Sequence, residues 1–277
     1  MNQLSVQESG PKVQFLKLPE GRIAFEVSGE GPLVVCVPGM GDLRGVYRFL
    51  VPDLLEAGFR VAAMDLRGHG DSDASFGRYD DVATGEDILT LIEHLDGPAT
   101  VIGNSMGAGA AAWAAAEKPE LIESLVLIGP FVRDTPMPVV LKLVFRAALR
   151  RPWGRFAWRS YFRTLYPGRR PDGFRKHLAE IDASLARPAH WKAFVRTTRT
   201  SHAPAEARLN EVKARALVVM GEKDPDFPDP AAEAALLAGK LGCEVLLVPE
   251  AGHYPQAEYP EIVTPAIAAF LRGGTDA

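Results

Sequence analysis

The chain has 277 residues, enough for one large domain with an insertion or for two small domains. A hydrophobic fraction of 47% and a charged fraction of 24% are typical of a globular protein, and the net charge of 31 − 35 = −4 argues against nucleic-acid binding. No stretch approaches about 18 uninterrupted apolar residues, and residues 1–10 lack the apolar core of a signal peptide. We therefore expect no membrane-spanning helix, no leader and a cytoplasmic location. Cys36 and Cys243 lie in apolar runs, which predicts buried thiols rather than a disulfide framework.

Strand and helix patterns alternate along the chain. Residues 13–18 and 22–28 alternate apolar and polar side chains around a short turn, which predicts a hairpin with one wet face. Continuous apolar runs predict strands covered on both faces at residues 33–37, 60–64, 99–103, 124–128, 216–220 and 244–248. Helical patterns lie between them at residues 46–57, 81–95, 105–117, 230–241 and 260–271. This order predicts an α/β fold: a mostly parallel, doubly wound, eight-stranded sheet with the hairpin at an antiparallel edge.

Residues 131–208 interrupt this alternation, because they show helical spacing and no buried strand run. The stretch is basic: 17 Lys and Arg against 5 Asp and Glu give +12, so the remainder carries 14 − 30 = −16. We expect it to form a helical lid inserted at the carboxyl end of the sheet, where open α/β sheets bind ligands. Residues 1–130 and 209–277 would then form the core domain.

One short motif suggests a nucleophile. Gly103-Asn104-Ser105-Met106-Gly107 directly follows a predicted strand and precedes an Ala-rich helix. A serine on a sharp strand-to-helix turn needs small neighbours because the turn crowds them, and the two glycines supply these. The N-terminus of the helix favours developing negative charge beside the hydroxyl. Ser105 is therefore a candidate nucleophile, although a serine that only caps the helix fits the same pattern.

With this motif in this order of elements, the chain resembles the α/β-hydrolase superfamily over essentially its whole length. Residues 131–208 then occupy the family's usual cap position. The resemblance implies a histidine base, and His253, in the loop after the last predicted strand, matches the family's histidine loop. It also implies an acid between serine and histidine, which Asp224 at the end of Met220-Gly-Glu-Lys-Asp224 would supply. Asp226 and Asp134 are alternative positions for that acid.

The run Val37-Pro38-Gly39-Met40-Gly41 follows the first buried strand and resembles the family's oxyanion loop. The donors would be the backbone N–H groups of Met40 and Met106. The family's loop usually begins His-Gly, and Pro38 replaces the histidine, so a side chain that often braces the loop is missing. A plain turn is the competing interpretation.

A second turn, from Asp65 to Ser72, resembles the D-x-R-G-x-G-x-S turn of the same family, which implies a structural role for Asp65 and His69. We find no Cys, His or carboxylate cluster with metal-ligand spacing and no Walker-type phosphate loop. The sequence therefore predicts no metal and no cofactor.

Basic residues recur every four positions in the predicted lid, so that they form stripes along helix faces. These are Lys142, Arg146 and Arg150, then Arg151, Arg155, Arg159 and Arg163. The opposite faces carry Leu141, Val144, Phe145 and Leu149, then Trp153, Phe156, Trp158 and Phe162. We expect solvated basic faces and apolar faces that close on the active site. Contact with an anionic membrane surface, or an inward arginine that binds a substrate carboxylate, are the alternatives.

These features together predict a serine hydrolase that cleaves a small to medium, mainly apolar ester through an acyl-enzyme. Phe131, Trp153 and Trp158 are the expected pocket residues. A carbon–carbon bond hydrolase of the meta-cleavage-product type, whose elbow the sequence resembles except at Ala108, and a perhydrolase are rival enzymes. A ligand-binding or signalling protein on the same fold is a rival of another class. The partner would be a small-molecule substrate, and the protein a monomer or homodimer.

Overall fold

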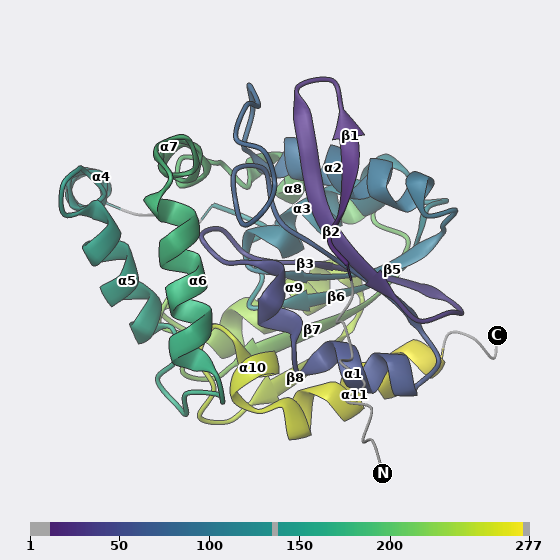
Figure 1. Ribbon diagram of the computed structural model, residues 1–277. Coiled ribbons are helices and arrows are strands. Elements are labelled where there is room, and N and C mark those ends of the chain that lie inside the picture. Colours follow the sequence, from purple (N-terminus) through teal and green to yellow (C-terminus); the bar gives the residue numbers. More distant parts are fainter. Residues whose placement is uncertain (1–11, 135–137, 274–277) are drawn as a thin grey trace, which may run out of the picture.

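The computed structural model describes residues 12–134 and 138–273, and eight strands in this part of the chain form one open sheet (Figure 1). The strands are β1 (Gln14–Leu18), β2 (Gly21–Ser28), β3 (Leu33–Val37), β4 (Arg60–Met64), β5 (Ala99–Asn104), β6 (Ile122–Ile128), β7 (Arg215–Gly221) and β8 (Glu244–Val248). Their order in the sheet is β1-β2-β4-β3-β5-β6-β7-β8. β1 and β2 pair antiparallel, as do β2 and β4, and the remaining pairs are parallel. The predicted fold class and the antiparallel edge hairpin are confirmed.

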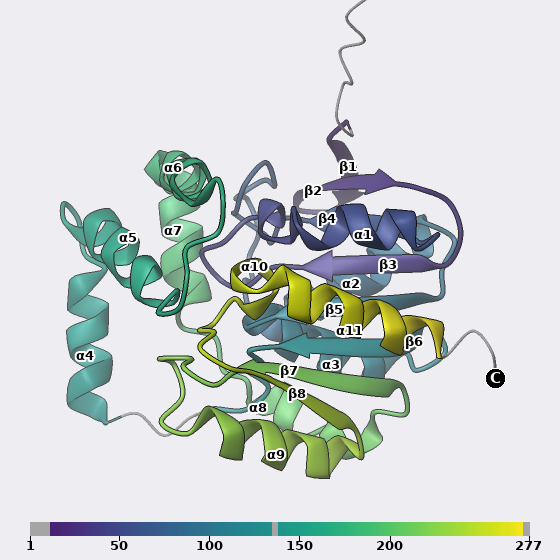
Figure 2. The same ribbon diagram turned by 90° about the horizontal axis from the view of Figure 1, so that it is seen from below.

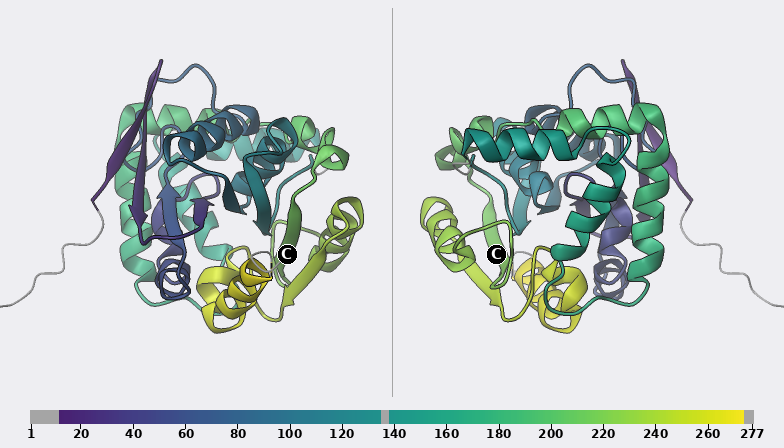
Figure 3. Two further views of the ribbon diagram at one scale, coloured as in Figure 1. Left: turned by 90° about the vertical axis from the view of Figure 1, so that its right-hand side faces the viewer. Right: turned by 90° about the vertical axis from the view of Figure 1, so that its left-hand side faces the viewer.

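Helices cover both faces of the sheet, as the continuous apolar strands require. All five residues of β3 are buried, so neither of its faces meets water. α1 (Leu50–Glu56) and α11 (Pro260–Arg272) pack on one face, and α2 (Asp81–His94), α3 (Met106–Glu117) and α9 (Pro230–Leu241) pack on the other (Figure 2). The N-terminal hairpin and α9 lie at opposite sides of the molecule (Figure 3). This doubly wound arrangement brings the carboxyl ends of the parallel strands to one edge.

Predicted and observed elements differ mainly at their ends. The predicted helix at 46–57 is a 3₁₀ turn, η1 (Arg44–Tyr47), followed by α1. Pro52 lies in the first turn of α1, the part of a helix that accommodates a residue without an N–H most easily, so it favours a helix that begins near Leu50. The four-residue α10 (Pro255–Glu258) was not predicted. Both cysteines are free, with Cys36 buried and Cys243 partly buried.

Between β6 and β7 the described residues form helices and no strand. They are α4 (Val139–Ala148), α5 (Gly154–Thr164), α6 (Phe174–Ala186), α7 (Pro188–Thr197), α8 (Ala203–Glu206) and the 3₁₀ turn η2 (Leu209–Glu211). We call α4 to α8 the inserted helices. Residues 1–11, on which the predicted absence of a leader rests, lie outside the described part of the chain, as do 135–137 and 274–277. None of the described helices is long and apolar enough to cross a membrane.

The expectation that the apolar faces of the inserted helices close on the active site is only partly correct. Leu149, Trp158 and Phe162 are buried in the main core cluster. Val144 on α4 and Phe156 on α5 are instead more than half exposed, at 57% and 63%. The reason is that α4 packs inward only through its Phe145 and Leu149 side, so its other apolar side faces outward.

Candidate functional site

Ser105 occupies the sharp turn between β5 and α3. Its backbone has φ 57° and ψ −123°, a conformation that non-glycine residues rarely adopt. A Cβ on Gly103 would lie 2.4 Å from the carbonyl oxygen of Gly107, so glycine is the residue that fits there. The Ser105 N–H donates to the carbonyl of Ile128 at 2.9 Å, and its own carbonyl accepts from Phe131 N–H at 3.2 Å. The surrounding backbone thus holds the strained turn in place.

His253 lies in the loop that follows β8. Its N–H donates to the carbonyl of Leu165 at 2.9 Å, and its carbonyl accepts from the side-chain amide of Asn104 at 3.2 Å. Asn104 also donates to the carbonyl of Ile128, at 3.0 Å. The residue directly before Ser105 therefore ties the histidine loop to the ends of β5 and β6. Both Ser105 and His253 are buried.

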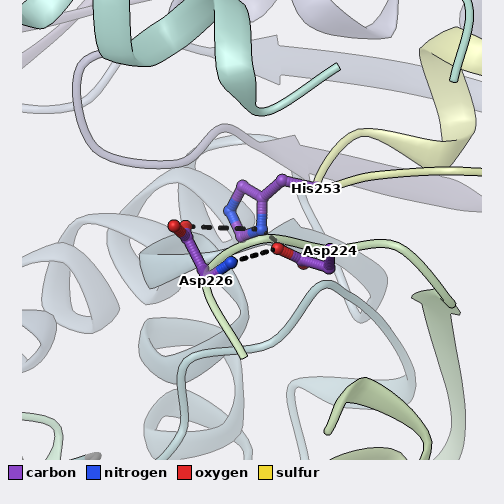
Figure 4. A group of neighbouring side chains, drawn as sticks. All are labelled: Asp224, Asp226 and His253. Atoms are coloured by element: carbon purple, nitrogen blue, oxygen red, sulfur yellow. Dashed lines mark hydrogen bonds and ion pairs between the residues drawn. The ribbon is translucent and has the colours of Figure 1, made fainter. Parts of the chain in front are cut away.

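The imidazole of His253 is oriented by Asp224. Nδ1–H donates to Asp224 Oδ2 at 2.7 Å, which leaves Nε2 as the nitrogen available to another group (Figure 4). Burial opposes the imidazolium, but the carboxylates of Asp224 and Asp226 outweigh it and raise the pKa of His253 to about 9. The Ser105 hydroxyl makes no hydrogen bond with any other described residue, so it is free to engage a partner. Catalytic hydrogen bonds are often incomplete until substrate binds.

Asp226 is a second carboxylate beside the same imidazole (Figure 4). Its Oδ2 lies 3.8 Å from His253 Nδ1, and its N–H donates to Asp224 Oδ1 at 3.0 Å. The hydroxyl of Tyr161, on α5, donates to Asp226 Oδ1. Burial raises the pKa of the Asp226 carboxyl, and the charge of His253 opposes that rise. Distance therefore favours Asp224 over Asp226 as the partner of His253.

Among the described residues, one group could offer three ligand atoms to a metal ion: Asp224, Asp226 and His253. One potential ligand atom from each of them lies within 4.8 Å of the other two. Two ligand atoms on a tetrahedral zinc ion, each bonded at about 2.0 Å, lie about 3.3 Å apart. The 2.7 Å between His253 Nδ1 and Asp224 Oδ2 is shorter and is the length of a charge-assisted hydrogen bond. The geometry is that of an acid–base pair rather than a metal site.

The loop after β3 lies against the serine turn. A Cβ on Gly39 would lie 2.8 Å from Ser105 Cβ, so the backbone of this loop passes directly beside the serine. Met106 is the first residue of α3, so its N–H has no acceptor within the helix. The N–H of Met40 has no hydrogen-bond partner in the part of the chain that the structure describes. Both predicted donors are thus without an acceptor in the described part of the chain, as a role in binding an oxyanion would require.

His69 braces this loop from the turn after β4. Its Nε2 accepts from Gly41 N–H at 3.0 Å, and its Nδ1–H donates to the carbonyl of Arg67 at 2.9 Å. Burial lowers the pKa of His69 to about 4, which keeps the ring neutral and Nε2 an acceptor. This contact supplies the support that Pro38 was expected to remove.

A model of the α/β-hydrolase family matches residues 34–266. The chain belongs to the α/β-hydrolase family. It is 31% identical over 289 residues to the dihydrolipoyllysine-residue acetyltransferase component of the acetoin cleaving system of Pseudomonas putida, with 96% of this chain and 71% of that protein covered. It is 30% identical over 260 residues to 2-(acetamidomethylene)succinate hydrolase of Mesorhizobium japonicum, with 91% and 92% covered. An esterase structure from Exiguobacterium antarcticum shares the fold at 20% identity, with a TM-score of 0.81 over 93% of this chain and 98% of that chain.

Replacing His69 with alanine is expected to destabilise the hydrolase. The change leaves the buried N–H of Gly41 without an acceptor, which costs about 1–3 kcal/mol. Urea unfolding measures this difference in the free energy of unfolding. His69→Gln retains an acceptor and should recover part of the loss. Equal stability of His69→Ala and the natural protein would contradict the bracing role.

The inserted helices closely cover the loop after β3, which is the predicted oxyanion loop. A Cβ on Gly41 would lie 2.3 Å from the ring of Trp158 and 2.8 Å from that of Phe194. His177, on α6, shares a buried contact with Asp42 in the same loop, with Nε2 2.6 Å from Oδ1. The second oxygen of Asp42 is buried and has no partner among the described residues. The loop is therefore fixed from the core side by His69 and from the inserted helices by His177.

The three expected pocket residues lie in different environments. The ring of Phe131 lies 5.8 Å from that of His253 and 4.8 Å from that of Phe227. Trp158 lies over the oxyanion loop, as described above. Trp153 is 54% exposed at the start of α5, and its indole N–H donates to the carbonyl of Ala147 on α4. This exposed position is not that of a side chain enclosed in a pocket.

Asp134 and Asp65 accept hydrogen bonds from other parts of the chain. Asp134 accepts from the Ser201 hydroxyl and from the N–H of His202. Asp65 accepts from Arg44 and from the N–H of Asp71, which fits a structural role. A groove of about 800 Å³ opens between α6 and the β2–β4 side of the sheet, and Ser105, Asp224 and His253 do not line it. The groove is therefore separate from the candidate site.

Sequence reasoning did not find the roles of Tyr161, Asp42 and His177. Asp42 directly follows the oxyanion-loop motif, which is a signal that it supports the loop. His177 lies among the buried Phe174, Leu178 and Ile181 on one side of α6, and a histidine on an apolar helix side needs a partner. No local pattern connects Tyr161 to Asp226, because that pairing depends on how α5 is placed.

Proposed function

We propose that this α/β-hydrolase family member is a serine hydrolase in which Ser105, His253 and Asp224 form a catalytic triad. The observation that carries the proposal is the 2.7 Å hydrogen bond between His253 and Asp224 beside a serine turn of strained geometry. The order Ser105, Asp224, His253 along the chain is that of α/β hydrolases. The side-chain amide of Asn104 donates to the carbonyl of His253. The N–H of Phe131 donates to the carbonyl of Ser105, and its ring lies beside that of His253.

The proposed reaction has two steps. In the first, His253 Nε2 takes the proton of Ser105, the Oγ attacks the ester carbonyl, and the N–H groups of Met40 and Met106 donate to the oxyanion. Collapse of this intermediate breaks the bond to the alcohol oxygen, which receives the proton from His253. In the second step, water attacks the acyl-enzyme with His253 as base, and Ser105 leaves as the free hydroxyl. Asp224 stabilises the imidazolium in both steps.

The surroundings of Ser105 support a mainly apolar ester as substrate. Phe131 lies beside the histidine ring and against Phe227, and Trp158 and Phe194 lie against Gly41 of the loop after β3. Apolar and aromatic linings with few polar groups are typical of small-molecule sites. Trp158 on α5 and Phe194 on α7 lie in close contact with Gly41. These two helices therefore limit the volume available to the acyl group.

The activity is expected to rise with pH up to about pH 9. His253 must be neutral to act as base, and its pKa of about 9 means that the imidazolium predominates below that pH. The profile of kcat/KM against pH reports this pKa for the free enzyme. Asp226→Asn removes a charge that favours the imidazolium, so the rising limb should move to lower pH.

The matched control is Asp53→Asn, which makes the same change in net charge at an exposed position on α1. It should leave the profile unchanged. If the rising part of the pH profile of Asp226→Asn falls at the same pH as in the natural protein, this carboxylate does not affect the pKa of His253.

A panel of p-nitrophenyl esters from two to twelve acyl carbons, together with a coloured vinylogous diketone, tests the proposed reaction class. We expect turnover of the esters, with a preference for short or medium chains, and none of the diketone. Cleavage of the diketone without ester hydrolysis would favour the carbon–carbon bond hydrolase instead.

A further inference from the structure

Exposed apolar side chains gather on one part of the inserted helices. Of the eleven large hydrophobic residues exposed in the described part of the chain, seven lie between residues 139 and 156. We call these seven residues the α4 patch: Val139, Val140, Leu141, Leu143, Val144, Trp153 and Phe156. Val139 and Val140 are each 72% exposed. Such a cluster is unusual on a protein surface that meets only water.

The α4 patch exists because α4 is apolar on two sides. Phe145 and Leu149 are four residues apart and pack toward the core cluster of the molecule. Val140 and Val144 are also four residues apart, and they point away from it. α4 lies at the far side of the inserted helices from the sheet in both views (Figures 1 and 2). The fold therefore uses one apolar side of the helix and leaves the other uncovered.

Positive charge borders this patch, and only part of it is paired: Arg155 on α5 forms an ion pair with Asp182 at 2.8 Å. Residues 135–171 contain one lysine and eight arginines, and no Asp or Glu. Arg146, Arg150 and Arg151 are exposed, and none of them forms an ion pair with another described residue. A protein of net charge −4 thus carries an apolar surface bordered by cations at one end. Apolar and aromatic side chains beside Lys and Arg are the features of helices that lie in the headgroup region of anionic bilayers.

We propose that the α4 patch docks the protein on the surface of an anionic lipid bilayer. The apolar side chains enter the boundary between headgroups and acyl chains, and the arginines contact phosphate groups. A second copy of the chain fits this surface less well. A twofold dimer would place the same patch on itself and bring two sets of unpaired arginines together.

Flotation with vesicles tests the proposal independently of any enzymatic activity. Vesicles of phosphatidylcholine with 30 mol% phosphatidylglycerol are compared with vesicles of phosphatidylcholine alone, at about 50 mM and about 500 mM NaCl. We expect the protein to bind anionic vesicles at low salt. Binding to neutral vesicles, and binding to anionic vesicles at high salt, should each be at least ten-fold weaker. Binding that is equal on both vesicle types, or absent from both at low salt, would overturn the proposal.

Two pairs of variants locate the surface. Val140→Ser with Val144→Ser should lower vesicle binding at least ten-fold, whereas Leu236→Ser with Ile262→Ser, at exposed positions of the core helices, should not. A triple variant removes three positive charges beside the patch: Arg146→Gln, Arg150→Gln and Arg151→Gln. It should weaken vesicle binding more than a control that removes three positive charges at the exposed residues Lys12, Lys17 and Lys213, each replaced by Gln.

Equal effects within either pair would overturn the assignment of the surface. Light scattering on the same proteins gives the other decisive outcome. A dimer that the α4 variants dissociate, in a protein that binds no vesicles, would show that the occupant is a second copy.

Discussion

Ser105→Ala is expected to lower kcat on an activated ester by at least about 1,000-fold while the fold stays intact. The change removes the oxygen that would form the acyl-enzyme, and the remaining oxyanion donors give only a small part of the rate. The alanine side chain fits the space of the serine, and no hydrogen bond of the hydroxyl with a described residue is lost. The unfolding midpoint should therefore change little.

Steady-state kinetics with purified protein measure this effect, and thermal unfolding checks the fold. Ser28→Ala, a serine at the end of β2, is the matched control and should keep full activity. An active Ser105→Ala protein would exclude Ser105 as the nucleophile.

Asp224→Asn is expected to lower kcat by about 10,000-fold, the loss that follows when the histidine of such a triad is held in the wrong tautomer. An amide cannot stabilise the imidazolium, and its N–H₂ group can donate to Nδ1 and place the proton on Nε2. His253 would then be unable to take the serine proton. The variant also tests the choice between the acids that the sequence left open.

Asp134→Asn is the matched control for this change. Asp134 accepts hydrogen bonds from Ser201 and His202, so its loss should leave kcat within a few-fold of the natural protein. A large loss in Asp134→Asn combined with an active Asp224→Asn protein would reverse the assignment of the acid.

The fold could be predicted from the sequence because its signals are local. β3 and β8 occupy the predicted residues, since a continuous apolar run between helices specifies a strand. β3 is buried throughout, but β8 is only partly buried because it is the edge strand of the sheet, so the expectation that it is covered on both faces was wrong. The turn at Ser105 was also visible, because the glycines on either side are needed by the backbone itself. The convergence of His253 and Asp224 followed from the rule that parallel strands end at one edge of the sheet.

The parts that could not be predicted depend on contacts between distant segments. The pairings of Tyr161 with Asp226 and of His177 with Asp42 join residues 65 and 135 positions apart. The exposed position of Trp153 depends on which side of α4 and α5 packs inward, and both sides of α4 are apolar. Periodicity indicates that a helix has an apolar side, but a helix with two such sides leaves its orientation open.

Covalent trapping tests the account most directly. A fluorophosphonate reacts with a serine only where a neighbouring base and oxyanion donors activate it. We expect the folded protein to incorporate one equivalent of the probe, with peptide mass mapping that locates the adduct on Ser105. His253→Ala should abolish the reaction. Turnover of an ester by protein that takes up no probe, or a probe attached at another residue, would contradict the proposed triad.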